Sequence, residues 1–169
     1  MNIRIGNGFD VHKFSPDRKL ILGGVHIEHP QGLLGHSDAD VLVHAIIDSL
    51  LGAGSLPDIG QLFPDTDPQY KDISSLELLQ KVGNMLGDMQ VQIINIDSIV
   101  ICESPKIYPY IDAMKKNISN SLNGLETERI GIKGKTSEGL GFTGRGEGIA
   151  AMAVCLVLFN GHFDKLSDH

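Results

Sequence analysis

The chain has 169 residues, and its 41% hydrophobic content suffices for the core of one compact domain. With 21 acidic and 14 basic residues it carries a net charge of -7, which argues against a general affinity for nucleic acid or anionic membranes. The longest apolar run, Ile149 to Phe159, is too short to span a bilayer, and no apolar signal core begins the chain. Cys102 and Cys155 lie in apolar runs typical of reduced, buried thiols, so we expect a cytoplasmic protein.

The first half of the chain predicts two strands followed by two helices. Residues 2–12 and 19–25 predict the strands, the second ending in the turn Gly23-Gly24. Residues 37–52 predict a helix with one buried face, an N-cap at Ser37 or Asp38 and a stop at Gly52. Residues 75–87 predict another helix, because Ser74-Ser-Leu-Glu77 is a capping-box pattern. Segment 54–72, rich in proline and aspartate, predicts an acidic loop.

The second half predicts further strands and one helix. Residues 91–103 and 129–135 predict strands, and Pro109 predicts the start of a helix that runs to Asn120. Both alternating faces of residues 149–159 are apolar, which fits a strand buried on both sides or a core helix, and we favour the strand. The predicted fold class is therefore α+β, a single domain with a mixed β-sheet covered by helices.

Asp10, His12 and His44 are candidate metal ligands. Side chains two apart on a strand point to the same side, so Asp10 and His12 project together, and the helix after Ser37 could bring His44 to them. One carboxylate and two imidazoles suit zinc, and three ligands leave a tetrahedral position free for substrate. Asp48, one turn past His44, could orient the imidazole. The alternative is that these are ordinary hydrogen-bonded core residues.

A glycine-dense segment, residues 133–148, carries candidate phosphate ligands. Lys135, Thr136, Ser137 and Arg145 offer cations and hydroxyls, and glycines free backbone amides, as a diphosphate requires. Glu138 would repel phosphate unless a divalent cation such as magnesium or manganese bridges the two. Gly139 to Gly144 matches the glycine spacing of a dinucleotide-binding fingerprint. The chain that follows it is too short to complete a dinucleotide-binding fold, so we do not assign this function. The alternative is a surface hairpin loop with ordinary glycines.

Two shorter motifs could also contact a ligand. The acidic loop supplies acids and amides from Asp58-Ile-Gly60 and Phe63-Pro-Asp-Thr-Asp67, although such clusters usually only shape turns. Ser104-Pro-Lys106 could simply begin a helix, or its lysine and amides could bind a nucleotide phosphate.

Six blocks of the chain resemble one family in its own order. They are Gly8 to His12, Gly35 to Asp38, Asp58 to Gly60, Leu62 to Asp67, Ser104 to Lys106 and Gly141 to Gly148. From about Ile3 to Leu158 the chain resembles the 2-C-methyl-D-erythritol 2,4-cyclodiphosphate synthases of the non-mevalonate isoprenoid pathway. The resemblance implies a homotrimer with active sites between subunits and a synthase domain at residues 1–159. Residues 160–169 form a tail past the family's usual end, and we interpret its histidines as unligated.

The resemblance also assigns roles to residues. Asp10, His12 and His44 would hold zinc, and Glu138 would hold a second ion, Mg²⁺ or Mn²⁺. The methylerythritol phosphate would contact, in one subunit, His36, Ser37, Asp58, Gly60 and Asp65. The cytidine diphosphate would contact, in the neighbouring subunit, Ser104, Lys106, Ile107, Tyr108, Gly134, Lys135, Thr136 and Ser137. Phe142 and Arg145 join the substrate-binding set, and with Phe9 and Glu147 they match positions near the three-fold axis, where the family has a cavity. This chain has Lys135-Thr-Ser137 where the family often has a run of threonines.

The implied reaction is an intramolecular phosphoryl transfer, catalysed by a phosphorus-oxygen lyase. The 2-phosphate of 4-diphosphocytidyl-2-C-methyl-D-erythritol 2-phosphate attacks the β-phosphorus, closes a ring and expels CMP. Because the nucleophile is already an anion, we expect positioning and charge neutralisation to suffice, with His36, Lys135, Thr136 and Glu138 as the catalytic set. The alternatives are a zinc phosphoesterase and a non-catalytic trimer that binds a phosphorylated isoprenoid or nucleotide.

Overall fold

A five-stranded mixed sheet forms the centre of the fold. The computed structural model describes residues 2–64 and 66–160, so the predicted tail after Asn160 lies outside the described residues. The strand order is β4-β1-β7-β5-β6; β7 is antiparallel to β1 and β5, and β5 is parallel to β6. The strands are β1 (Asn2–Ser15), β4 (Gly32–Leu33), β5 (Val91–Ile101), β6 (Ile130–Lys135) and β7 (Gly148–Phe159). The predicted α+β class with a mixed sheet is confirmed.

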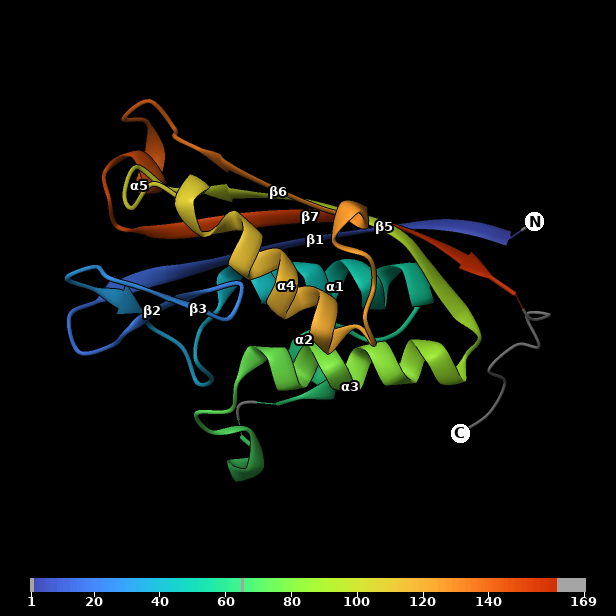
Figure 1. Ribbon diagram of the computed structural model, residues 1–169. Coiled ribbons are helices and arrows are strands. Elements are labelled where there is room, and N and C mark those ends of the chain that lie inside the picture. The colour runs from blue at the N-terminus through green and yellow to red at the C-terminus, as the bar shows by residue number, and fades with distance from the viewer. Residues whose placement is uncertain (1, 65, 161–169) are drawn as a thin grey trace.

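Helices pack against one face of this sheet in two layers (Figure 1). Helix α1 (Val41–Gly54) lies directly on β1 and β7, and α3 (Ser75–Asp88) packs on α1 from the other side. Helix α4 (Ile111–Ser121) lies beside them against α3 and β6. A small hairpin, β2 (Leu20–Leu22) and β3 (Val25–Ile27), completes this side. The short helices are α2 (Ile59–Leu62), α5 (Gly141–Gly144), η1 (Pro68–Tyr70), η2 (Tyr108–Tyr110) and η3 (Thr127–Arg129).

Two glycines let α1 approach β1 closely. A Cβ atom at Gly6 would lie 1.8 Å from the Ser49 carbonyl oxygen, and one at Gly8 would lie 2.0 Å from the Ala45 carbonyl oxygen. Neither distance is compatible with a side chain, so the strand backbone contacts the helix directly. The helix is buried on nearly all sides, because the sheet covers one side and α3 the other. This contact brings His44 over the even-numbered residues of β1.

Helix α1 begins later than predicted. Asp40 is its N-cap: the carboxylate accepts a hydrogen bond from the Val43 amide at 3.1 Å. The same carboxylate accepts the Gly23 amide at 3.0 Å and the Gly24 amide at 2.6 Å. Ala39, at a φ of 57°, interrupts any helix that would start at Ser37, so the prediction of Ser37 or Asp38 as N-cap is wrong. The helix also passes the predicted stop at Gly52 and ends at Gly54.

Replacing Asp40 with alanine is expected to lower the free energy of unfolding by about 3–5 kcal/mol. The buried amides of Gly23 and Val43 and the partly buried amide of Gly24 would lose their acceptor, and an unmade buried hydrogen bond is costly. Asp40→Asn keeps one acceptor oxygen and should lose less. Urea unfolding followed by circular dichroism measures both variants, and a loss below about 1 kcal/mol for Asp40→Ala would contradict the assignment.

Strand β7 confirms the strand prediction for residues 149–159 but not burial on both sides. Its odd-numbered residues face the helices, whereas Met152 and Val154 on the other side are each 47% exposed. In β1 the even-numbered residues likewise face α1 and the odd-numbered residues face outward. Together these side chains form what we call the outer apolar face: Ile3, Ile5, Phe9, Val11, Met152 and Val154. An exposed apolar surface that extends over two paired strands is typical of an interaction surface.

The remaining predictions hold with local changes. Residues 75–87 form α3, but the Ser74 hydroxyl makes no capping hydrogen bond, so the capping box is not formed. Pro109 lies in η2, immediately before α4. The predicted acidic loop contains α2 and η1, and the glycine-dense segment contains α5. Cys102 and Cys155 are both free and buried, as expected. Of the described helices, none combines the length and apolar character that a membrane crossing requires.

Candidate metal centre and adjoining pockets

Three side chains converge where α1 crosses β1. Asp10 and His12 project from the same side of β1, and His44 comes from the first turn of α1. His44 Nδ1 lies 2.9 Å from Asp10 Oδ2 and 3.1 Å from His12 Nε2, and His12 Nε2 lies 3.0 Å from Asp10 Oδ2. The structure therefore brings together the three residues predicted as metal ligands.

Neighbouring groups fix which nitrogen of each imidazole faces the cluster. The His12 Nδ1–H donates to the Leu34 carbonyl oxygen at 2.7 Å, which leaves Nε2 directed at Asp10. His44 Nε2 contacts the Ser75 hydroxyl at 2.8 Å and the Ser37 hydroxyl at 3.2 Å, which leaves Nδ1 directed at the cluster. Such hydrogen bonds to the remote nitrogen are the usual way in which a protein orients a ligating histidine.

The electrostatics of the cluster favour a positive charge between its ligand atoms. Burial raises the pKa of Asp10, but the hydrogen bonds and charges of His12 and His44 prevail and hold that pKa well below its usual range. Burial lowers the pKa of His12, but the hydrogen bond and charge of Asp10 prevail and raise it. A carboxylate oxygen and two imidazole nitrogens meet here with their lone pairs directed inward, and a cation satisfies all three.

The donor set and its spacing fit a metal ion. Asp10, His12 and His44 each offer one ligand atom, and these atoms lie within 4.8 Å of one another. In a tetrahedral site with bonds of about 2.0–2.1 Å, ligand atoms are about 3.3 Å apart. The observed separations of 2.9 to 3.1 Å are close to that value. Two nitrogens and one oxygen leave a position open for another ligand, which is characteristic of catalytic sites.

Ser75 supports His44, a role that its place inside the predicted Ser74-Ser-Leu-Glu77 capping box does not indicate. Asp38 accepts hydrogen bonds from the Ser75 amide, at 3.0 Å, and from its hydroxyl. Asp38 on the loop before α1 thus holds the first residue of α3 beneath the imidazole. Asp48 does not orient the His44 imidazole, as was predicted. Its carboxylate instead accepts a hydrogen bond from the Ile59 amide at 2.9 Å and so anchors α2.

A cavity of about 190 Å³ opens onto the cluster, and we call it the metal pocket. His36, Ser37 and Gly60, three of the residues predicted to hold the methylerythritol phosphate, line it together with the three ligands. Asp58 instead caps α2, where its carboxylate accepts the Gln61 amide at 2.9 Å. Asp65 lies outside the described residues. Apolar side chains that were not among the predicted site residues complete the wall: Ile59, Phe63, Tyr70, Ile73 and Leu78.

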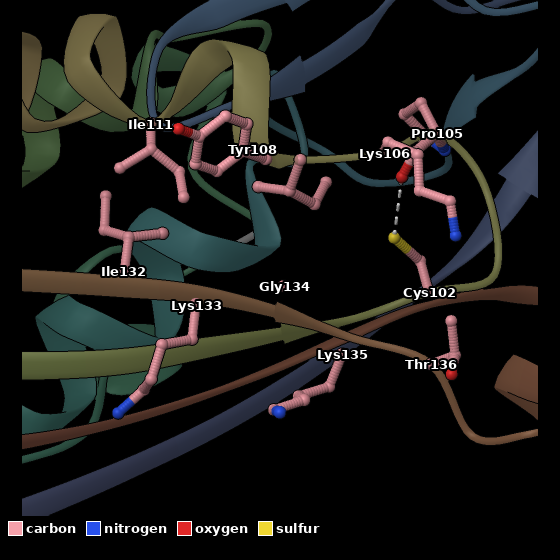
Figure 2. Close-up of a pocket in the computed structure, with 11 residues that line it drawn as sticks. Cys102, Pro105, Lys106, Tyr108, Ile111, Ile132, Lys133, Gly134, Lys135 and Thr136 are labelled. Carbon is pink, nitrogen blue, oxygen red and sulfur yellow. Dashed lines mark hydrogen bonds between the residues drawn. The ribbon is translucent and has the colours of Figure 1, made fainter.

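A second cavity of about 480 Å³, the edge pocket, lies between β6 and the segment after β5 (Figure 2). Its wall contains most of the residues predicted to contact cytidine diphosphate: Lys106, Ile107, Tyr108, Gly134, Lys135 and Thr136. Ser104 and Ser137 do not line it. The Lys135 side chain leaves β6 on the side away from Tyr108 (Figure 2), so it presents its backbone rather than its ammonium group to the cavity. Cys102 and Ile132 also line the cavity and could have been found from strand alternation.

The glycine-dense segment folds into a turn and the short helix α5. The Thr136 hydroxyl donates to Glu138, the predicted ligand of the second ion. Arg145 pairs with Glu147 at 2.7 Å, and Phe142 is 39% exposed beside it. Phe142 and Glu147 line a third cavity of about 520 Å³ that Val11, His12 and Lys13 also border. Within the part of the chain that the structure describes, the metal pocket and the edge pocket share no residue.

Fold and cluster together define a single-domain α+β protein with a candidate metal site that opens onto a pocket. The YgbB family model matches residues 3–158. The 2-C-methyl-D-erythritol 2,4-cyclodiphosphate synthase of Clostridium acetobutylicum is 58% identical over 156 residues, which cover 92% of this chain and all of that protein. The synthase of Clostridioides difficile is 56% identical over 156 residues, which cover 92% of this chain and 96% of that protein. The chain therefore belongs to the YgbB family, among the 2-C-methyl-D-erythritol 2,4-cyclodiphosphate synthases, as its six sequence blocks predicted.

Solved structures agree with this family. IspF from Plasmodium falciparum, in its CDP complex, has a TM-score of 0.82 and 37% identity, covering 95% of this chain and 98% of that one. The bifunctional IspDF from Campylobacter jejuni has a TM-score of 0.89 and 44% identity. This chain is covered to 94% in that comparison but spans only 42% of the bifunctional protein.

Proposed function

We propose that this chain converts 4-diphosphocytidyl-2-C-methyl-D-erythritol 2-phosphate into 2-C-methyl-D-erythritol 2,4-cyclodiphosphate and CMP. The observation that carries the proposal is the convergence of Asp10, His12 and His44 at the metal pocket of a chain whose relatives bear the name of this synthase. The domain that acts is residues 1–159. The two free, buried thiols suit a reducing compartment, and we assign the reaction to the cytoplasm.

The proposed assembly is a homotrimer in which each active site lies between two subunits. The outer apolar face supports it, because burying such a surface against other copies removes apolar area from water. The separation of the two pockets supports it as well. One substrate molecule with its methylerythritol phosphate at the metal pocket and its cytidine diphosphate at an edge pocket would use the pockets of neighbouring chains.

The chain's own residues would mainly orient the substrate and balance its charge. Bound by Asp10, His12 and His44, zinc would supply Lewis-acid stabilisation of phosphate charge, and Mg²⁺ or Mn²⁺ at Glu138 would do the same for the leaving group. His36 and Ser37 would hold the 2-phosphate, whose oxygen attacks the β-phosphorus. Lys106 would neutralise the nucleotide phosphates, and Thr136 would orient Glu138, to which it already donates. Because the attacking phosphate oxygen is already an anion, no general base needs to remove a proton from it. The residues need only hold this oxygen in line with the bond that breaks at the β-phosphorus.

The proposal is tested by incubating the protein with this substrate, zinc and magnesium and following the phosphorus NMR spectrum. We expect a cyclic diphosphate and CMP in equal amounts and no inorganic phosphate. Release of inorganic phosphate from this substrate or from simple phosphoesters would instead identify a zinc phosphoesterase. Tight binding without turnover by the metal-loaded protein would identify a non-catalytic binding protein.

The shared site makes a prediction about hybrid trimers. Lys106→Ala and His12→Ala should each be nearly inactive alone. In a randomly mixed trimer containing both variants, one of the three sites combines an intact His12 with an intact Lys106 from the neighbour. Equal mixing should therefore restore about a quarter of the wild-type activity. Mass spectrometry verifies the mixing, and no recovery in verified hybrids would place each site within one chain.

A further inference from the structure

Glu103 occupies the junction between the two segments that form the edge pocket. It lies two residues after the end of β5 and directly before Ser104, where the predicted nucleotide-binding segment begins. Its carboxylate oxygen Oε1 accepts the Ser137 amide at 2.9 Å and approaches the Gly139 amide at 3.4 Å. The contact therefore runs from the end of β5 to the turn after β6.

That turn has a conformation that needs support. Glu138 has a φ of 52° and Gly139 a φ of 78°, so both lie in the left-handed region, which a non-glycine residue seldom adopts. The amides on either side of Glu138 point to one oxygen of Glu103. Backbone amides of one turn that converge on a single acceptor in this way form an anion-binding nest. Here the anion is the chain's own Glu103 carboxylate. The glycine content predicts backbone amides that are free to bind a diphosphate, but the Ser137 and Gly139 amides are already occupied by this carboxylate.

The supported turn carries the groups assigned to the second ion. Thr136 donates to Glu138 across the turn, and the Ser137 and Thr143 hydroxyls are hydrogen-bonded to each other. The Cys102 amide donates to the Lys135 carbonyl oxygen at 2.9 Å, which joins the two segments one residue before Glu103. Glu103 continues this connection beyond the end of the β5–β6 ladder.

We propose that Glu103 is a positioning residue that holds the Thr136 to Gly139 turn in the conformation that presents Glu138 to the diphosphate-bound cation. The proposal rests on the proposed function for the identity of the ligand. Glu103 would not contact substrate or metal itself. Its acceptor oxygen, rather than its charge, would carry the effect.

The test compares Glu103→Ala with Glu103→Gln, which keeps an acceptor oxygen of similar reach. In Glu103→Ala, amide hydrogen exchange in residues 136–140 should become about tenfold faster, because the Ser137 and Gly139 amides lose their acceptor oxygen. By calorimetry with MnCl₂ present, CDP should bind about tenfold more weakly. Glu103→Gln should stay within about threefold of wild type in both measurements. Glu128→Ala, which removes an exposed carboxylate elsewhere, is the matched control and should behave as wild type.

Two further measurements separate positioning from general damage. Zinc content should remain one ion per chain in all variants, and exchange in α1 should be unchanged. Unaltered exchange in residues 136–140 of Glu103→Ala would overturn the proposal. So would a Glu103→Gln variant as impaired as Glu103→Ala, or exchange that accelerates equally in α1. If wild-type protein fails to bind CDP with manganese, the proposed function loses its nucleotide site, and the exchange data still decide whether Glu103 holds the turn.

Discussion

His44→Ala is expected to abolish stoichiometric zinc binding and to lower CMP formation by a factor on the order of 100 or more. The substitution leaves Asp10 and His12 as the remaining protein ligands of the cluster. Two ligands do not retain a zinc ion in competition with water and buffer as three do. Metal analysis after dialysis measures the stoichiometry, and the coupled release of CMP measures the rate.

The chain should stay folded, because α1 is held by contacts on nearly every side. The loss of the His44 hydrogen bonds to Ser37 and Ser75 should cost about 1–3 kcal/mol, which far-ultraviolet circular dichroism and thermal unfolding will show. The control is His26→Ala, which removes an exposed imidazole from β3 and should keep one zinc ion per chain. A His44→Ala protein that still retained one zinc ion per chain would refute the ligand assignment.

Gly8→Ala is expected to lower the free energy of unfolding by about 3 kcal/mol or more. The added methyl group would lie 2.0 Å from the Ala45 carbonyl oxygen and 2.8 Å from the Ser49 amide nitrogen, both backbone atoms of α1. Either the helix or the strand must move, and His44 moves with the helix. The melting temperature should fall by about 6–12 °C, and zinc affinity should fall with it because the ligands come from the two displaced elements.

Gly87→Ala is the matched control for this substitution. Gly87 lies in α3 with a helical φ, and an added Cβ would meet no atom within 4 Å. Alanine should therefore stabilise the chain by about 0.5–1 kcal/mol through the lower entropy of the unfolded state. Urea unfolding of both variants measures the difference. Wild-type stability in Gly8→Ala would mean that α1 does not lie against the β1 backbone.

The sequence predicted what depends on local periodicity. The strands at β1, β5, β6 and β7, helix α3 and the joint projection of Asp10 and His12 follow from residue spacing along one segment. The start of α1 could not be predicted in this way. Ser37 and Asp38 are as good N-caps as Asp40, and what selects Asp40 is its contact with the Gly23 and Gly24 amides, remote in sequence.

The residues that support the candidate site could not be predicted from the sequence, for the same reason. Ser75 reaches His44 from a different helix, and Glu103 reaches Ser137 from a different strand end. Each pairing depends on how elements pack, which a single sequence does not encode in its periodicity. The outer side of β7 shows another limit, because apolar side chains indicate that a face will be covered but not whether the chain itself covers it.

β1 has consequences for how this protein can vary in length. Its even-numbered side chains include the two candidate metal ligands Asp10 and His12, and its odd-numbered side chains include Phe9 and Val11 of the outer apolar face. Inserting or deleting a single residue between Gly8 and Asp10 would exchange the two sets, sending the carboxylate to the outside and a hydrocarbon side chain toward α1. The candidate metal site and the outer apolar face thus depend on the same alternation of side chains along β1. An insertion or deletion of one residue there would disrupt both together.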